Sequence, residues 1–156
     1  MVAIDDIDTL EHDLGITARD NVRADNTGTN NILSYNSTVD AKDWIHLGRV
    51  FDKGQNKFPV PYIVIETVDY TEENVTTGGK KEAFIPIIYH AWIDQAVNNP
   101  IDLIEIKDRL KKLARDMQNN TGIMKVKVTA AGIVPEDEGT RVLQHVTVRS
   151  NVFWRQ

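Results

Sequence analysis

The sequence predicts an α+β fold, in which a mixed or antiparallel sheet of about five strands is packed by two helices. Two stretches, 4–14 and 100–117, repeat apolar residues every three or four positions, which is the period of an amphipathic helix. The other runs are rich in β-branched residues or alternate apolar with polar residues, as strands do. Their order predicts the arrangement helix, loop, three strands, helix, two strands.

The chain has 156 residues, which is the length of one ordinary domain, and we interpret 1–156 as a single domain. Within it we expect an N-terminal helix over 1–23, a polar loop or arm over 24–43, and a core of sheet and helix over 44–156.

The N-terminal helix is predicted from four regularly spaced apolar residues, which are Ile4, Ile7, Leu10 and Leu14. Gly15 is a candidate for the end of this helix, although Val22 and the apolar residues before it continue the pattern as a second, weaker segment. The stretch 24–40 that follows has the composition of turns and loops. We interpret it as an arm or mobile loop, with Ile32, Leu33 and Tyr35 as its anchors.

Three strands are predicted in the middle of the chain, over 45–51, 62–68 and 83–93. The last of these is apolar at both sets of alternating positions, so both of its faces are expected to be covered. Pro86 lacks the N–H group that a sheet ladder needs, and is therefore expected at an edge or a bulge. A polar loop is predicted over 71–81.

The clearest helix is predicted over 100–117, with Asn99 as its N-cap and Gly122 near its end. A closing hairpin follows, with strands over 124–130 and 142–152 and a turn over 135–139.

Composition bounds the classes of function. The chain has no cysteine, so it has neither a thiolate nucleophile nor a cysteine-ligated metal site. Its net charge of −5 argues against a stable grip on nucleic acid through phosphate contacts. No apolar run approaches the ~20 residues that a membrane span needs, and the acidic N-terminus does not resemble a signal peptide.

Candidate catalytic groups are sparse. The four histidines are dispersed, and His90 with Asp94 is the nearest approach to a site-like pair. The acidic residues at 72–73 and 136–138 fall in predicted loops, where carboxylates are solvated. Gly78 and Gly79 lack the rest of a phosphate-binding loop. We therefore predict no catalytic, cofactor or metal site, and keep a small hydrolase that uses His90 with a loop carboxylate as an alternative.

One segment of the sequence carries a resemblance to a known family. The stretch 48–52 (GRVFD) and then 58–65 (FPVPYIVI) resembles the opening strands of phage tail-terminator and tail-completion proteins. There a V-[FY]-D strand end leads through a short loop to F-P-Y-V-V-I, and Val60 and Pro61 are inserted here relative to that motif. The run 83–92 looks like the family's long strand ending in H-x-W. The helix 100–117 and the strand 145–150 follow in the expected order, so the resemblance covers 45–154.

The resemblance implies a structural virion protein, made in the host cytoplasm, that forms a hexameric ring in the tail. Such a ring caps the tail tube and joins it to the head connector, while DNA passes through its lumen without sequence-specific binding. It implies no enzymatic activity, no cofactor and no membrane. The alternatives are another tail or neck component, such as a tube subunit or head–tail connector, and a plain adaptor without a ring.

Ring closure requires two different, complementary faces on each subunit. The basic residues of the helix 100–117 are interpreted either as a solvated face or as a contact with an acidic neighbour, such as the N-terminal helix. The hypothesis for subunit and tube contacts names Asp5, Asp6, Lys107, Lys111, Arg115, Glu72, Glu73, Lys80 and Lys81. The hypothesis for the lumen names Glu136, Asp137 and Glu138, whose charge repels DNA.

Overall fold

A computed structural model of the chain describes residues 9–48, 61–68, 74–75, 81–94, 100–137 and 142–155. Several residues of the contact and lumen hypotheses lie outside these ranges, namely Asp5, Asp6, Glu72, Glu73, Lys80 and Glu138. The predicted N-cap Asn99 and the motif residues 49–60 also lie outside them.

The described helices are α1 (Leu10–Arg23), α2 (Ala41–Trp44) and α3 (Pro100–Asp116), with short 3-10 helices at Ile32–Asn36 and Met117–Asn119. The strands are β1 (Ile45–Leu47), β2 (Tyr62–Thr67), β3 (Asn74–Val75), β4 (Lys81–Asp94), β5 (Ile123–Asp137) and β6 (Val142–Arg155).

The strands form one mixed sheet in the order β1-β2-β4-β6-β5, with β3 paired to β4 beside this path. Only the β1–β2 pair is parallel among the described strand pairs. The predicted α+β class and the order of the main elements are therefore confirmed. The short α2 and β3 were not predicted, and β3 lies within the stretch 71–81 that was interpreted wholly as a loop.

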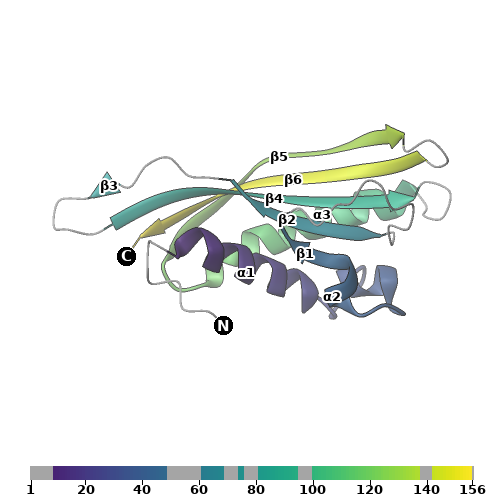
Figure 1. Cartoon of the computed structure of the whole chain (residues 1–156), viewed down its shortest axis with the longest axis horizontal. Coiled ribbons are helices and arrows are strands. Elements are labelled where there is room, and N and C mark those ends of the chain that lie inside the picture. Colours follow the sequence, from purple (N-terminus) through teal and green to yellow (C-terminus); the bar gives the residue numbers. More distant parts are fainter. Residues whose placement is uncertain are drawn as a thin grey trace.

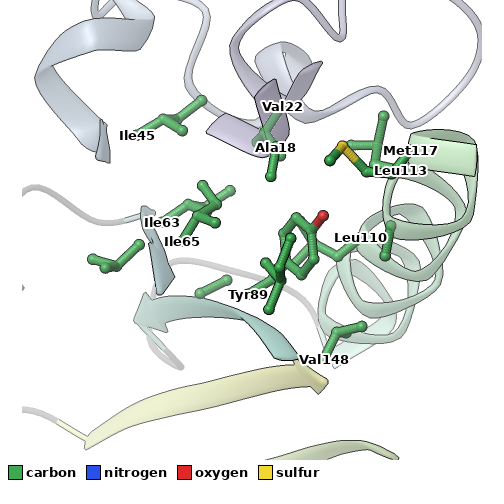
Figure 2. Close-up of a cluster of buried hydrophobic side chains, with 14 of the residues drawn as sticks. Ala18, Val22, Ile45, Ile63, Ile65, Tyr89, Leu110, Leu113, Met117 and Val148 are labelled. Carbon is green, nitrogen blue, oxygen red and sulfur yellow. The ribbon is translucent and has the colours of Figure 1, made fainter. Parts of the chain in front are cut away.

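The long helices lie on one side of the sheet, as Figure 1 shows. On that side, alternate residues of the strands are fully buried against them. Figure 2 shows Tyr89 of β4 and Val148 of β6 pointing toward Leu110 of α3, while Ala18 and Val22 of α1 pack above Ile63 and Ile65 of β2. This single helix-covered face holds most of the core.

Gly15 does not end the N-terminal helix, because α1 runs through it from Leu10 to Arg23. The glycine is buried, and a Cβ at this position would lie 2.8 Å from Leu47 Cδ1 and 3.2 Å from Thr67 Cγ2. A missing side chain therefore lets the helix approach β1 and β2 closely. The part of the predicted helix before residue 9 lies outside the described residues.

The stretch predicted as an arm or mobile loop is packed onto the helix layer. Ile32 is fully buried, as its role of anchor requires. Asp25 is also buried and holds Arg109 of α3, so a charged residue within the polar stretch fixes it to the core. Within this stretch the buried Asp25 serves internal hydrogen bonds, whereas residues 26–30 and 37–40 are exposed.

The turn of the closing hairpin was placed too early in the chain. Pro135, Glu136 and Asp137 continue β5 and pair with β6, with Glu136 opposite Leu143. Pro86 lies within the central strand β4, next to the point where the pairing of β4 with β2 ends. The register with β2 stops at Ile87, and the Pro86 carbonyl accepts from the Val68 N–H at 3.1 Å on that side. The missing proline N–H therefore interrupts no ladder between described strands.

Candidate functional site

The side of the sheet turned away from the helices carries the densest group of polar and aromatic side chains. We call it the helix-free face, because none of the described helices packs on it. On β4 it is formed by the residues that alternate with the buried Ile85, Ile87 and Tyr89, namely Phe84, Pro86, Ile88, His90, Trp92 and Asp94. The strand registers add to it the neighbours of these residues on β2, β6 and β5.

Two histidines that are 55 residues apart in the chain meet on this face. His90 Nδ1 lies 2.9 Å from His145 Nε2, and the rings stack with centroids 5.1 Å apart. His90 Nε2 lies 3.2 Å from a carboxylate oxygen of Glu66 on β2. Both ring nitrogens of His90 are therefore engaged, one on each side of the ring.

Trp92 closes the other end of the group. Its ring stacks on His145 with centroids 4.4 Å apart, and its indole N–H donates to Glu136 Oε2 at 2.7 Å. The second oxygen of Glu136 lies 3.8 Å from His145 Nδ1. Glu66, His90, His145, Glu136 and Trp92, which we call the imidazole cluster, thus form a connected chain across four strands.

Protonation of the imidazole cluster is constrained by this geometry. In a hydrogen bond between two imidazoles one nitrogen donates and the other accepts, so at least one of the rings is neutral. Burial lowers the pKa of His145, the nearby His90 lowers it further, and Glu136 acts in the opposite direction. The cluster is therefore held together best when His145 carries no positive charge.

The arrangement is a linear relay of hydrogen bonds and is poorly suited to hold a metal ion. Glu66 and His145 lie at opposite nitrogens of the His90 ring, so these groups do not converge on one point. Within the described residues, no group of three or more histidine and acidic side chains has the geometry to bind a metal. The side chains that His90 contacts through its ring nitrogens are Glu66 and His145.

Sequence reasoning missed Glu66 and His145 because their proximity to His90 depends on strand register. Thr147, and not His145, stands directly opposite His90, so the histidine contact is diagonal across the strands. Glu66 stands opposite Ile88 and also reaches His90 diagonally. The sequence signal was that His90, His145 and Glu66 each fall on a predicted strand near another polar residue. This signal does not determine which residues of different strands lie side by side.

The basic residues predicted on the second helix separate into two groups. Lys107, Lys111 and Arg115 lie on α3, and Lys111 pairs with Asp108 at 3.3 Å. Arg109 belongs instead to the interior, since it holds the buried Asp25. Lys81 begins β4 and Glu136 lies near the end of β5, so these two candidates sit at opposite ends of the sheet.

Comparison with known proteins adds no relative from which a role can be transferred. No family model matches the chain, and the search of curated proteins finds no match. Among the described helices, none is long and apolar enough to cross a membrane.

Proposed function

We propose that the protein is a structural assembly subunit of a phage tail, which forms a ring that caps the tail tube and joins it to the head connector. Two lines of reasoning support this proposal. The first is the resemblance of the stretch 45–154 to tail-terminator and tail-completion proteins, with its order of strands around one helix. The second is that the described long helices lie on one side of the sheet and do not cover the other side (Figure 1).

The observation that carries the proposal is the helix-free face. It presents large apolar side chains to solvent, with Phe84 at 42% and Val134 at 57% exposure. Phe84 lies beside Phe153 at one end of this face, and Val134 lies opposite His145 toward the other end. A sheet face that carries apolar side chains and is covered by none of the described helices is a candidate contact with another macromolecule. A subunit that completes its second sheet face only in an assembly fits this arrangement.

Ring closure supplies a role for the charged helix residues. A closed ring joins a patch on one subunit to a different patch on the next. Lys107, Lys111 and Arg115 of α3 are the proposed basic patch, and the acidic residues Asp5 and Asp6 are its proposed complement. The stretch 71–81 is the proposed contact with the tube, and the acidic stretch 136–138 is the proposed lining of the lumen.

The test is electron microscopy of the purified protein at high concentration, with particles sorted into classes. We expect closed six-fold rings with a central hole. The Lys107→Glu, Arg115→Glu double variant is expected to lose the rings. Lys42→Glu is the control, because Lys42 lies outside α3, is largely exposed and pairs with the nearby Asp40. A uniformly monomeric protein, both alone and mixed with tail tubes, would contradict the proposal.

The same experiment separates the alternatives. A tube subunit polymerises into long tubes instead of closing one ring. A small hydrolase that uses His90 requires a free ring nitrogen to take a proton from water or substrate. The engagement of both His90 nitrogens weighs against that reading.

A further inference from the structure

The charge of the helix-free face differs between the two ends of its strands, and one end is basic. Lys125 stands in register with Phe153, and Lys127 with Asn151, so both lysines lie on this face of β5 and both are exposed. Phe84 of β4 stands opposite Phe153, and their rings meet edge to face with centroids 5.2 Å apart. Two cations therefore lie at the same end as an aromatic pair of which Phe84 is exposed.

The other end of the same face is acidic. Glu136 stands opposite Leu143 on β6, and Asp94 of β4 stands opposite the same leucine from the other side. Glu136 accepts the indole N–H of Trp92 with one oxygen, yet its side chain remains 47% exposed. Midway between the two ends, Arg149 of β6 and Glu66 of β2 stand opposite Ile88 of β4, one on each side, and we call these residues the central row. Their opposite charges offset one another.

Between the two charged ends, β5 presents small residues on this face. Ala130 stands opposite Arg149 and Gly132 opposite Thr147. A Cβ built on Gly132 meets no described atom within 4 Å, so the space above it is open. A second surface can therefore approach β5 closely at its middle.

The outer edge of β5, which pairs with no described strand, is by contrast unsuited to adding another strand. Its pairing register shifts between Ile123 and Lys125 and again between Val128 and Ala130. Bulges of this kind, together with lysines and a proline such as Pro135, are the features that protect edge strands from pairing with other chains. Contact through the face is therefore favoured over contact through the edge.

We infer that a second copy of this chain docks on the helix-free face with its strands reversed, so that the basic end of each copy lies over the acidic end of the other. A two-fold axis across the strands, near the central row, superposes β5 on β5 and brings Lys125 over Glu136 of the second copy. A two-fold axis along the strands would place the basic end over the basic end and the acidic end over the acidic end, which charge repulsion disfavours. This contact rests on the proposed role as an assembly subunit and is additional to the contact that closes a ring. It assigns Glu136 to the docking face in place of the lumen.

The size of the face sets the strength of this contact. Ten residues of β4 extend about 33 Å, and four strands span about 15 Å, which gives on the order of 500 Å² per copy. That is smaller than the roughly 800 Å² per partner of a standard stable interface, so we expect reversible, concentration-dependent association.

Sedimentation velocity over a range of concentrations tests the charge pattern. We compare Lys125→Glu, Lys127→Glu with Asp94→Lys, Glu136→Lys, and use Lys42→Glu, Lys112→Glu as the control. Each face variant is expected to weaken self-association about tenfold or more, because like charges then meet. An equimolar mixture of the two face variants is expected to restore pairing, since every contact in the mixed pair is again complementary. Self-association that charge reversal leaves unchanged, or a mixture that stays monomeric, overturns the inference.

Disulfide trapping gives a second readout that does not depend on charge, because the chain has no cysteine of its own. Lys125→Cys mixed with Glu136→Cys is expected to form the mixed disulfide, whereas Lys125→Cys alone is not expected to cross-link. Cross-linking of Lys125→Cys to itself would overturn the reversed orientation. Charge-dependent pairs without rings would refute the proposed function alone, and rings that are insensitive to these variants would refute this inference alone.

Discussion

Arg109 of α3 donates from Nε to the carboxylate of Asp25 at 2.7 Å, which joins two residues that are 84 positions apart in the chain. The Asp25 side chain is only 4% exposed, and it also accepts from the Ile32 N–H at 2.8 Å. The hydrogen bond to Asp25 raises the pKa of Arg109. One ion pair thus fastens the polar stretch after α1 to the helix layer.

Removing one partner of this pair is expected to be far more damaging than removing both. Asp25→Ala leaves the Arg109 charge without its partner, and is expected to lower the free energy of unfolding by about 3–5 kcal/mol. The double variant Asp25→Ala, Arg109→Met is expected to lose less than the sum of the single variants. Urea unfolding of the four proteins of this cycle measures the difference, and strict additivity would contradict the expected coupling.

Tyr89→Phe is expected to stabilise the protein by about 1–3 kcal/mol, because it removes a buried hydroxyl that lacks a hydrogen bond. Tyr89 is fully buried beneath α3, and its hydroxyl has no partner within the described part of the chain. Tyr35→Phe is the matched control, since the Tyr35 hydroxyl donates to Glu105 at 3.2 Å. The control is expected to destabilise slightly. Thermal unfolding compares the two, and a lower melting temperature for Tyr89→Phe would contradict the prediction.

Substitution of Gly15 tests the close approach of α1 to the sheet. Gly15→Ala is expected to change the free energy of unfolding by less than about 1 kcal/mol, because improved helix propensity offsets a contact that the Leu47 side chain can relieve. Gly15→Val is expected to destabilise by about 1–3 kcal/mol through overpacking against Leu47 and Thr67. Equal stability of the wild type and Gly15→Val in urea unfolding would refute the close packing.

The imidazole cluster predicts a loss of stability in acid. Because the pKa of His145 in the folded protein lies below its ordinary value of 6.5, the unfolded chain binds the proton more readily. The contribution of His145 is therefore fully present above about pH 6.5 and is lost as the pH falls toward the folded-state pKa. His145→Gln is expected to show a shallower decrease between neutral and mildly acidic pH. An unchanged pH profile of the melting temperature in this variant would remove His145 from the explanation.

The strongest sequence predictions concerned local periodicity. The apolar repeat with Leu103, Ile106 and Leu110 predicted α3, and each of these residues is buried in it. The alternation of Ile85, Ile87 and Tyr89 predicted the long strand β4. These features are visible in the sequence because neighbouring residues of one element set its period, whatever it packs against.

The errors arose where a local signal was overridden by a distant contact. Gly15 has poor helix propensity, yet the nearness of Leu47 favours a glycine within α1. Pro135 and Glu136 read as a turn, but pairing with β6 extends β5 through both of them. In each case the residue that decides the local structure lies more than five positions away in the chain. Local sequence patterns do not contain information about such a contact.

The sequence by itself determined the α+β class, the order of the main elements and the face that α3 buries, because these depend on short-range periodicity. The prediction that both faces of the strand 83–93 are covered was wrong, since the described helices cover one face and Phe84 is 42% exposed on the other. Only the tertiary structure decided the burial of Asp25 beside Arg109, because it depends on the packing of the stretch after α1 against α3. The tertiary structure also decided the register of the strands, and with it the contact between His90 and His145 and the opposite charges at the two ends of the helix-free face. Register is set by the packing of the whole sheet, and a shift of a single residue would turn these strand side chains to the other face.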